Sequence, residues 1–257
     1  MVLIGLFDSG VGGFSIASAL RRRLPTSDLL YIADRARAPW GTKSDEQILE
    51  MSIELTDRLI DLGSELVVVA CHTGSVVALE SLRRRHPQIP FVGLDPAIKP
   101  AASLGNGTVA VLATPTTLRS RSYQKLVNTH ATGVEVVAVP CPRWVELVES
   151  GITSGPLAEE LVGEVLDPLK HKGINTFVLA CTHFPFLENV IRQRIGSEAV
   201  LVAPTEGVVR QVERLAKGES GIGNTKVIST GPEDGVVQTV AVLGGLRVAE
   251  KDLTFSS

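Results

Sequence analysis

Two cysteines end similar apolar segments in the two halves of the chain. Segment 66–75 reads LVVVACHTGS and contains Cys71, and segment 177–184 reads FVLACTHF and contains Cys181. Each pattern is typical of a buried strand that releases a thiol at its carboxyl end, where ligands bind in open α/β sheets. Because the thiolate is the reactive form of cysteine, the repeat predicts an enzyme with two opposed thiols in one site.

Other chemistry is compatible with some of the same residues. A zinc site remains an alternative, with four ligands: Cys71, His72, Cys181 and His183. The sequence has no closely spaced cysteine pair, and adjacent side chains on an extended backbone diverge, so we do not expect a metal. A phosphatase-type cysteine loop requires an arginine where Val77 stands. We expect the third cysteine, Cys141, to be structural because no polar cluster follows it.

Bulk composition limits the class of protein. The 257 residues are 44% hydrophobic and 21% charged, which predicts a packed core in one large or two smaller α/β domains. The net charge of −3 and the lack of a long basic run do not favour nucleic acid as a partner. Three cysteines are too few for a disulfide framework and indicate a reducing compartment. With no basic signal-peptide region and no long apolar stretch, we expect a cytoplasmic protein that meets no membrane.

Predicted strands and helices alternate along the chain. Apolar runs at 2–7, 29–33, 66–70, 91–94, 108–113, 134–139, 177–180 and 199–202 predict strands. Helical patterns fall between them, including 44–62, a stretch that follows TPTT at 114–117 and runs through Val127, 143–149, 156–170 and 185–195. Ser44 is the expected N-cap of helix 44–62, and Gly63 ends it. This alternation predicts doubly wound parallel sheets.

The second half of the chain repeats the first in outline. We therefore expect an α/β fold of two pseudo-symmetric, doubly wound lobes with the active site in the cleft between them. The first lobe is predicted to comprise residues 1–97 plus 208–257, and the second residues 98–207. The last part starts with a helical stretch, 208–215, and is expected to return to the first lobe.

A glycine-rich turn, DSGVGG at 8–13, follows the first predicted strand. A phosphate-binding turn is one interpretation, since backbone N–H groups at a helix start attract anions. The spacing fits neither dinucleotide-binding nor P-loop fingerprints. A generic tight turn and an active-site turn that presents Asp8 are the other interpretations, and we favour the last.

Several blocks along the chain together resemble one family. They are GLFDSGVGG at 5–13, YIAD at 31–34, PWGTK at 39–43, PAIKP at 96–100, RS at 119–120, LVE at 147–149 and CTHFP at 181–185. In this order they resemble the cofactor-independent glutamate racemases of the aspartate/glutamate racemase superfamily. The resemblance runs from about residue 3 to about residue 210.

The resemblance implies two-base racemisation of glutamate with no pyridoxal phosphate or other cofactor. Cys71 and Cys181 would exchange the α-proton on opposite faces. Asp8 would assist the first thiol, and His183 and Glu149 the second. The resemblance further implies a substrate-binding set consisting of Ser9, Pro39, Trp40, Gly41, His72, Thr73, Thr114, Thr117 and Thr182. It also implies a homodimer that supplies D-glutamate for peptidoglycan.

Three departures from the family pattern concern the substrate. The family has Cys-Asn-Thr-Ala-Ser where this chain has CHTGS at 71–75, so the bulkier His72 replaces an amide and Gly74 gives it room. Trp40 replaces a tyrosine, and APT at 203–205 replaces a segment containing Asp-Ser. Glutamate remains the first-choice substrate. The alternatives are a racemase for another amino acid, such as aspartate, and a catalytically silent binding paralogue.

Overall fold

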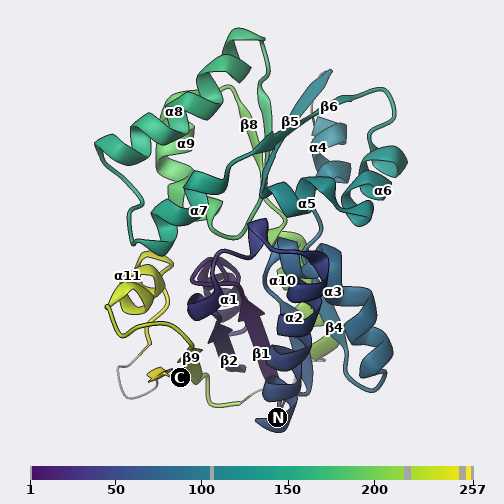
Figure 1. The fold of residues 1–257 in the computed structure, drawn as a ribbon, viewed down its shortest axis with the longest axis vertical. Helices are drawn as coiled ribbons and strands as arrows, with labels where there is room; N and C mark the ends of the chain where they lie inside the picture. Colours follow the sequence, from purple (N-terminus) through teal and green to yellow (C-terminus); the bar gives the residue numbers. More distant parts are fainter. Residues whose placement is uncertain (1, 105–106, 217–220, 249–252, 256–257) are drawn as a thin grey trace.

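A computed structural model describes residues 2–104, 107–216, 221–248 and 253–255. Figure 1 shows two lobes, one above the other. The first sheet has the strand order β10-β9-β2-β1-β3-β4 and the second β6-β5-β7-β8. Every strand pair found in the described chain is parallel. These two sheets, surrounded by helices, confirm the predicted α/β fold class.

The strands of the first sheet are β1 (Leu3–Asp8), β2 (Asp28–Ala33), β3 (Leu66–Val69), β4 (Phe91–Gly93), β9 (Thr225–Ser229) and β10 (Leu253–Phe255). Those of the second are β5 (Thr108–Ala113), β6 (Glu135–Pro140), β7 (Thr176–Ala180) and β8 (Val200–Val202). The inner strands β3 and β7 are buried along their whole length. Continuous apolar runs are what parallel strands covered on both faces require.

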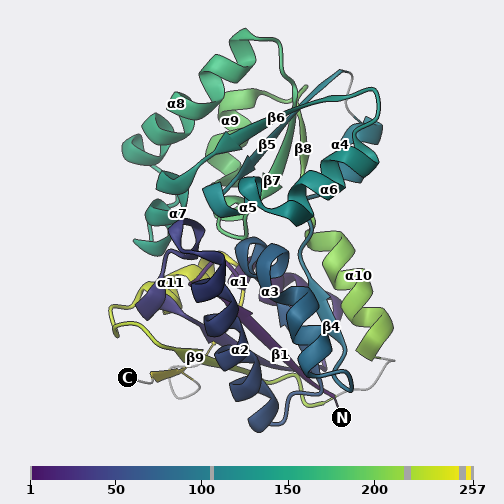
Figure 2. The same cartoon turned by 45° about the vertical axis from the view of Figure 1, so that its right-hand side comes forward.

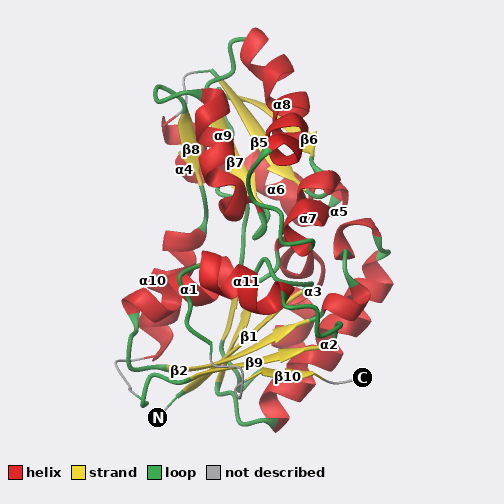
Figure 3. Cartoon of the chain, turned by 90° about the vertical axis from the view of Figure 1, so that its left-hand side faces the viewer, coloured by secondary structure: helices red, strands yellow, loops and turns green. Residues whose placement is uncertain are grey.

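Helices cover both faces of the sheets (Figures 2 and 3). The first lobe contains α1 (Phe14–Arg23), α2 (Asp45–Asp61), α3 (His72–Arg85), α10 (Thr205–Ala216) and α11 (Val236–Leu243). The second contains α4 (Ile98–Leu104), α5 (Pro115–Arg119), α6 (Arg121–His130), α7 (Pro142–Glu149), α8 (Pro156–His171) and α9 (Glu188–Ile195). Of these helices, none is long and apolar enough to cross a membrane in the part of the chain that is described.

Alternating strand residues build separate cores on the two faces of the first sheet. Leu6 belongs to a cluster that includes α1 and α10, whereas its neighbour Phe7 belongs to the cluster beneath α2 and α3. The cluster that contains Leu6 also includes Trp144 and Phe184 of the second lobe. One apolar core therefore extends through both lobes.

The predicted ends of α2 are confirmed. The Ser44 hydroxyl accepts a hydrogen bond from the Gln47 amide, and the Gln47 side chain accepts one from the Ser44 amide. Such a capping box satisfies N–H groups that have no partner within the helix. At the other end, Gly63 has a φ of 94°, a left-handed conformation that glycine adopts without steric cost.

Two predicted helices are wrong in detail. The helix expected to follow 114–117 and to run through Val127 is interrupted. Two helices, α5 and α6, take its place, because Ser120 is extended and caps α6 by accepting a hydrogen bond from the Tyr123 amide at 3.1 Å. The helix expected over 185–195 begins as a 3-10 turn, Phe184–Leu187, before α9.

The last part of the chain adds two strands to the first sheet. β9 pairs with β2, and β10 pairs with β9. Between them, α11 contacts α1. The predicted lobe boundaries remain predictions, and the second of them, between residues 207 and 208, falls inside α10.

Candidate active site

Cys71 lies where β3 ends and α3 begins. Its sulfur accepts a hydrogen bond from the Gly74 amide at 3.4 Å, so the thiol is the N-cap of α3. The Cys71 thiol also donates to Ser9 Oγ, 3.7 Å away. The side chain is buried, with 4% of its residue surface exposed. The strand-to-helix turn predicted at this cysteine is therefore present.

Cys181 follows β7 in the second sheet and is also buried. Its sulfur lies 3.6 Å from Nδ1 of His183. Three turn residues, beginning with Cys181, separate β7 from the 3-10 turn at Phe184–Leu187. This thiol is thus not a helix cap, and its principal polar neighbour is an imidazole.

Both thiols border one small cavity between the lobes. Its lining consists of Ser9, Trp40, Gly41, Cys71, His72, Thr73, Thr114, Val145, Cys181, Thr182 and His183. A much larger open cavity lies between α3, α4, α6 and α10, but no cysteine borders it. The small cavity is therefore where thiol chemistry is possible.

Asp8, the last residue of β1, is completely buried beside the first thiol. Its Oδ2 accepts a hydrogen bond from the Gly13 amide at 2.7 Å, and its Oδ1 one from Ser9 Oγ at 3.4 Å. Burial raises the pKa of Asp8 to about 6, although the positive charge of His183 opposes the shift. Asp8 can therefore exchange a proton near neutral pH.

Burial also raises the pKa of Cys71 well above its ordinary value, and the charge of Asp8 acts in the same direction. The hydrogen bonds of Cys71 with Gly74 and Ser9 act the other way but are weaker. Although a helix N-terminus by itself favours a thiolate, desolvation is the larger effect here. Cys71 is therefore a thiol at neutral pH.

The second thiol has a charged pair beside it. His183 Nε2 lies 2.6 Å from Oε1 of Glu149, the last residue of α7. Burial alone would lower the pKa of His183, but its hydrogen bonds to Cys181 and Glu149 and the charges of both groups raise it well above its ordinary value. Burial would raise the pKa of Glu149, but the interactions with His183 lower it. The imidazole is consequently a cation next to Cys181.

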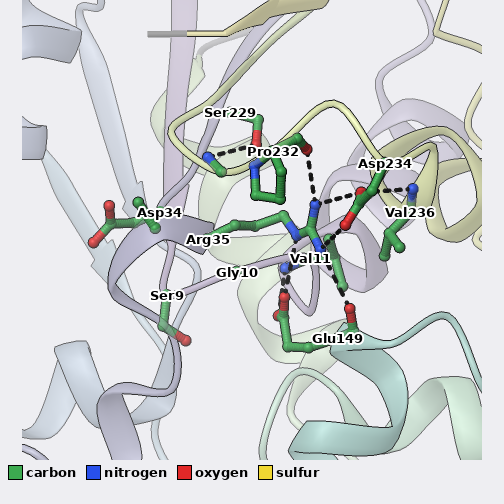
Figure 4. Close-up of polar contacts among 12 residues, drawn as sticks. Ser9, Gly10, Val11, Asp34, Arg35, Glu149, Ser229, Pro232, Asp234 and Val236 are labelled. Carbon is green, nitrogen blue, oxygen red and sulfur yellow. Dashed lines mark hydrogen bonds and ion pairs between the residues drawn. The ribbon is translucent and has the colours of Figure 1, made fainter. Parts of the chain in front are cut away.

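The glycine-rich turn of the first lobe reaches this charged pair. The Val11 amide donates to Glu149 Oε1 at 2.8 Å (Figure 4). A Cβ atom on Gly10 would lie 1.8 Å from Glu149 Oε1, and one on Gly12 would lie 2.4 Å from Nδ1 of His183. Glycine is therefore required for this close approach, and the turn amides of Val11 and Gly13 bind the protein's own carboxylates.

Three threonine hydroxyls meet across the lobes. Thr73 Oγ1 lies 2.9 Å from Thr114 Oγ1 and 3.4 Å from Thr117 Oγ1, while Thr114 and Thr117 are 2.9 Å apart. Thr182 and Ser9 also border the cavity. These hydroxyls can donate to a carboxylate that enters between them.

His72 borders the cavity without a hydrogen-bond partner. Only 2% of its surface is exposed, and neither ring nitrogen has a partner among the described residues. Burial lowers its pKa to about 3, so the ring is neutral at physiological pH. A buried ring with two unpaired polar atoms is costly, and a polar ligand in the cavity would satisfy them.

The segment at 39–41 contributes unequally to the cavity. Trp40 and Gly41 line it, whereas Pro39 is exposed and does not. The Trp40 indole N–H donates to Asp34 Oδ2 at 3.1 Å, so this donor is already used. Trp40 therefore offers the cavity an apolar ring.

The alternative of a zinc site finds no support in the geometry. Within the described ranges, no group of three or more His, Cys, Asp or Glu side chains is arranged to hold a metal ion. Cys141 is buried, and its thiol donates to the Val139 carbonyl at 3.4 Å. Burial raises the pKa of this thiol, as expected for a structural cysteine.

Arg35 contacts this site, although the sequence analysis did not single it out. Its Nε lies 3.5 Å from Glu149 Oε2. A lone arginine in a short loop gives no sequence signal of its own, because its partners are distant along the chain.

The fold and the paired thiols define a class of two-lobed α/β proteins with a cysteine from each lobe in one site. The model of the family described as Asp/Glu/Hydantoin racemase matches residues 15–212, and the chain belongs to this family.

Several relatives are glutamate racemases. The chain is 39% identical over 230 residues to the glutamate racemase of Ectopseudomonas mendocina, covering 89% of this chain and 85% of the relative. It is 41% identical over 213 residues to the glutamate racemase of Pseudomonas aeruginosa PAO1, covering 82% of this chain and 80% of the relative.

Solved glutamate racemases share the fold. The Escherichia coli enzyme, in complex with L-glutamate and the activator UDP-MurNAc-Ala, has a TM-score of 0.86 and 28% identity over 99% of this chain and 97% of its own. The Francisella tularensis enzyme, in complex with D-glutamate, has a TM-score of 0.84 and 28% identity over 100% of this chain and 97% of its own.

Proposed function

We propose that this protein interconverts L- and D-glutamate by moving the α-proton between two cysteines, without a cofactor. One observation carries the proposal: Cys71 and Cys181 border the same buried cavity, each with its own ionisable neighbour. The glutamate racemases among the relatives support glutamate as the substrate.

The reaction needs one thiol and one thiolate. Burial and Asp8 keep Cys71 protonated, so we assign the role of the base to Cys181, whose sulfur faces the imidazolium of His183. The Cys181 thiolate removes the α-proton from one enantiomer, and the electron pair of the broken C–H bond moves into the α-carbon and its carboxylate. The Cys71 thiol then gives its proton to the opposite face. The thiol and thiolate have exchanged roles, and the other enantiomer reacts from that state in reverse.

The carbanion needs stabilisation, since no electron-accepting cofactor takes part. Hydroxyl donors that meet the α-carboxylate as it gains charge would provide it in a site that excludes water. We assign this role to Thr73, Thr114, Thr117 and Thr182, with Ser9 beside Cys71. The lobes must separate to admit the substrate and then close over it.

A second candidate is the same reaction on another amino acid, such as aspartate. The observation that favours it is the unpaired, neutral ring of His72 in the cavity. A buried polar group that must match a polar group of the ligand discriminates strongly between substrates.

We further propose that the enzyme supplies D-glutamate for peptidoglycan in the cytoplasm, as a homodimer. Three free, buried cysteines fit a reducing compartment. Light scattering at several protein concentrations tests the dimer.

The activity is tested by polarimetry on purified protein with L-glutamate, D-glutamate, aspartate and a panel of other amino acids. Decay of the optical rotation of both glutamate enantiomers to zero is expected. Decay with another amino acid alone supports the second candidate. No decay with any amino acid overturns the racemase proposal and leaves the binding paralogue.

A further inference from the structure

Every nitrogen of the Arg35 guanidinium has an acceptor. Nη1 and Nη2 donate to the two carboxylate oxygens of Asp234 at 2.8 and 3.0 Å, and Nη1 also donates to the Pro232 carbonyl at 3.3 Å. Nε donates to Oε2 of Glu149 at 3.5 Å, and Nη2 donates to the Glu149 carbonyl at 3.4 Å. Only 8% of the side chain is exposed. Figure 4 shows the guanidinium between the two acidic residues.

These contacts join three distant segments. Arg35 belongs to the 3-10 turn after β2, Glu149 ends α7 in the second lobe, and Asp234 lies between β9 and α11. A planar guanidinium that meets a carboxylate with two parallel bonds is held in a fixed orientation. Asp234 therefore fixes Arg35, and Arg35 presents its remaining donors to the second lobe.

Glu149 needs this cation for a physical reason. The carboxyl end of a helix carries a partial negative charge, which repels a carboxylate on the last residue. Arg35 donates both to the carboxylate and to the main-chain carbonyl of Glu149, so it compensates both negative groups. The 3.5 Å contact is long, but the attraction is weakly screened because both side chains are mostly buried.

The orientation of Glu149 determines that of His183. Glu149 Oε1 is occupied by Val11 and His183, so Arg35 acts on the other oxygen, Oε2. With the two oxygens held from opposite sides, the carboxylate cannot rotate away from the imidazole. The opposite ring nitrogen of His183 faces Cys181.

We propose that Arg35 is a positioning residue for the Cys181 half of the site: fixed by Asp234, it holds Glu149 against His183. The inference rests on the proposed two-thiol reaction and adds a residue to it. The polar contacts found for Asp8 and Cys71 do not include Arg35. Its direct contacts therefore lie on the Cys181 side of the site, and its main effect falls on Cys181.

This one-sidedness provides the test. Native protein is treated briefly with iodoacetamide, and the alkylation rates of Cys71 and Cys181 are measured in the same sample by peptide mass spectrometry. The variants are Arg35→Gln, Arg35→Lys and Asp234→Asn. The control is Arg143→Gln. Arg143 lies in α7, the helix that ends at Glu149, and its substitution removes a solvent-exposed ion pair with Glu164 of α8. Racemisation by each variant is measured in parallel.

Arg35→Gln is expected to lower the Cys181-to-Cys71 rate ratio several-fold, because a displaced His183 no longer holds its positive charge beside the Cys181 sulfur, and a nearby imidazolium makes a cysteine more reactive. Its kcat/KM should fall about 10- to 100-fold, as misplacement of a catalytic group does. Asp234→Asn should show a smaller loss, Arg35→Lys partial rescue, and Arg143→Gln no change in either measurement.

An unchanged rate ratio in Arg35→Gln overturns the inference. This holds also when both rates rise by the same factor, because that result indicates general loosening of the lobes. If Arg35→Gln does not fold, Asp234→Asn and Arg35→Lys decide by the same ratio. The ratio of the alkylation rates can be measured without turnover, so it tests this inference separately from the proposed function. The proposed function fails if the wild-type protein does not racemise glutamate.

Discussion

Thr73 and Thr114 stand on opposite lobes with their hydroxyl oxygens 2.9 Å apart. A hydrogen bond of this length leaves no room for a carboxylate between them, although both residues border the cavity that holds the thiols. A substrate must therefore replace this contact with its own and separate the lobes as it enters. We propose that these two hydroxyls hold the lobes together in this structure and donate to the carboxylate of a bound substrate.

Thr114→Val should raise KM for glutamate about 10- to 100-fold, because a hydrogen bond to a charged group contributes about 1.5–3 kcal/mol. Steady-state kinetics in both directions measures the change. Thr176→Val is a matched control, since Thr176 is buried in β7 and does not border the cavity. An equal KM for Thr114→Val and the control would remove Thr114 from the binding site.

Cys71→Ser and Cys181→Ser should each abolish racemisation in both directions, because each direction uses both sulfurs. Each variant can still exchange the α-proton of one enantiomer with solvent, through the thiol that remains. Chiral chromatography and proton NMR in D2O measure the two processes. Cys141→Ser, which changes the buried cysteine outside the cavity, should retain racemisation. Near wild-type racemisation by either of the first two variants contradicts the two-thiol reaction.

The strand-and-cysteine repeat was the most informative sequence pattern. Buried parallel strands are recognisable as apolar runs, and their carboxyl ends meet at one edge of a sheet, so local patterns are enough to predict parallel sheets. The family resemblance supplied the roles of Asp8, Glu149 and His183. The structure adds how these residues are arranged, with Val11 and Arg35 holding Glu149 from two sides.

Contacts between distant segments were not predictable from local patterns. The partners of Arg35 lie in the second lobe and near the C-terminus, and a single charged loop residue does not indicate either. Likewise, β9 and β10 are short strands at one edge of the first sheet, and their pairing depends on the sheet already being formed. The break at Ser120 was missed because serine is compatible with both a helix interior and a cap.

Asp8→Asn should change stability in a pH-dependent way. The pKa of Asp8 in the folded protein is about 6, above its ordinary value of 3.8, so the folded state binds the proton more tightly than the unfolded state. The tighter binding of this proton stabilises the folded wild-type protein. The stabilisation is fully present below pH 3.8 and is lost as the pH rises through 6. At pH 8 the variant, which never carries the buried charge, should be more stable than the wild type by up to about 3 kcal/mol.

Urea unfolding of Asp8→Asn and wild type at pH 4, 6 and 8 measures this difference, which should grow with pH. Asp61→Asn, at an exposed position ending α2, is the control and should show no such trend. Racemisation by Asp8→Asn should fall, because we propose that Asp8 assists Cys71. A stability difference that is constant over this pH range contradicts the assignment of a raised pKa to Asp8.

His72 should determine which amino acids react. His72→Asn replaces the neutral ring with a smaller amide and should increase kcat/KM for glutamate relative to other amino acids. His72→Phe keeps the ring shape but removes both unpaired nitrogens, so it should be more stable to urea by about 1–3 kcal/mol and bind substrate poorly. An identical substrate profile for His72→Asn and wild type would exclude His72 as a specificity residue.

The two-thiol reaction on glutamate is tested most directly by proton NMR of the early reaction in D2O, starting from L-glutamate. Two thiols on opposite faces predict that newly formed D-glutamate carries deuterium at the α-carbon while the remaining L-glutamate keeps its proton. The same pattern, with the enantiomers exchanged, is expected when the reaction starts from D-glutamate. Early loss of the α-proton from the L-glutamate pool, at a rate equal to product formation, or product that retains the original proton, would contradict this mechanism.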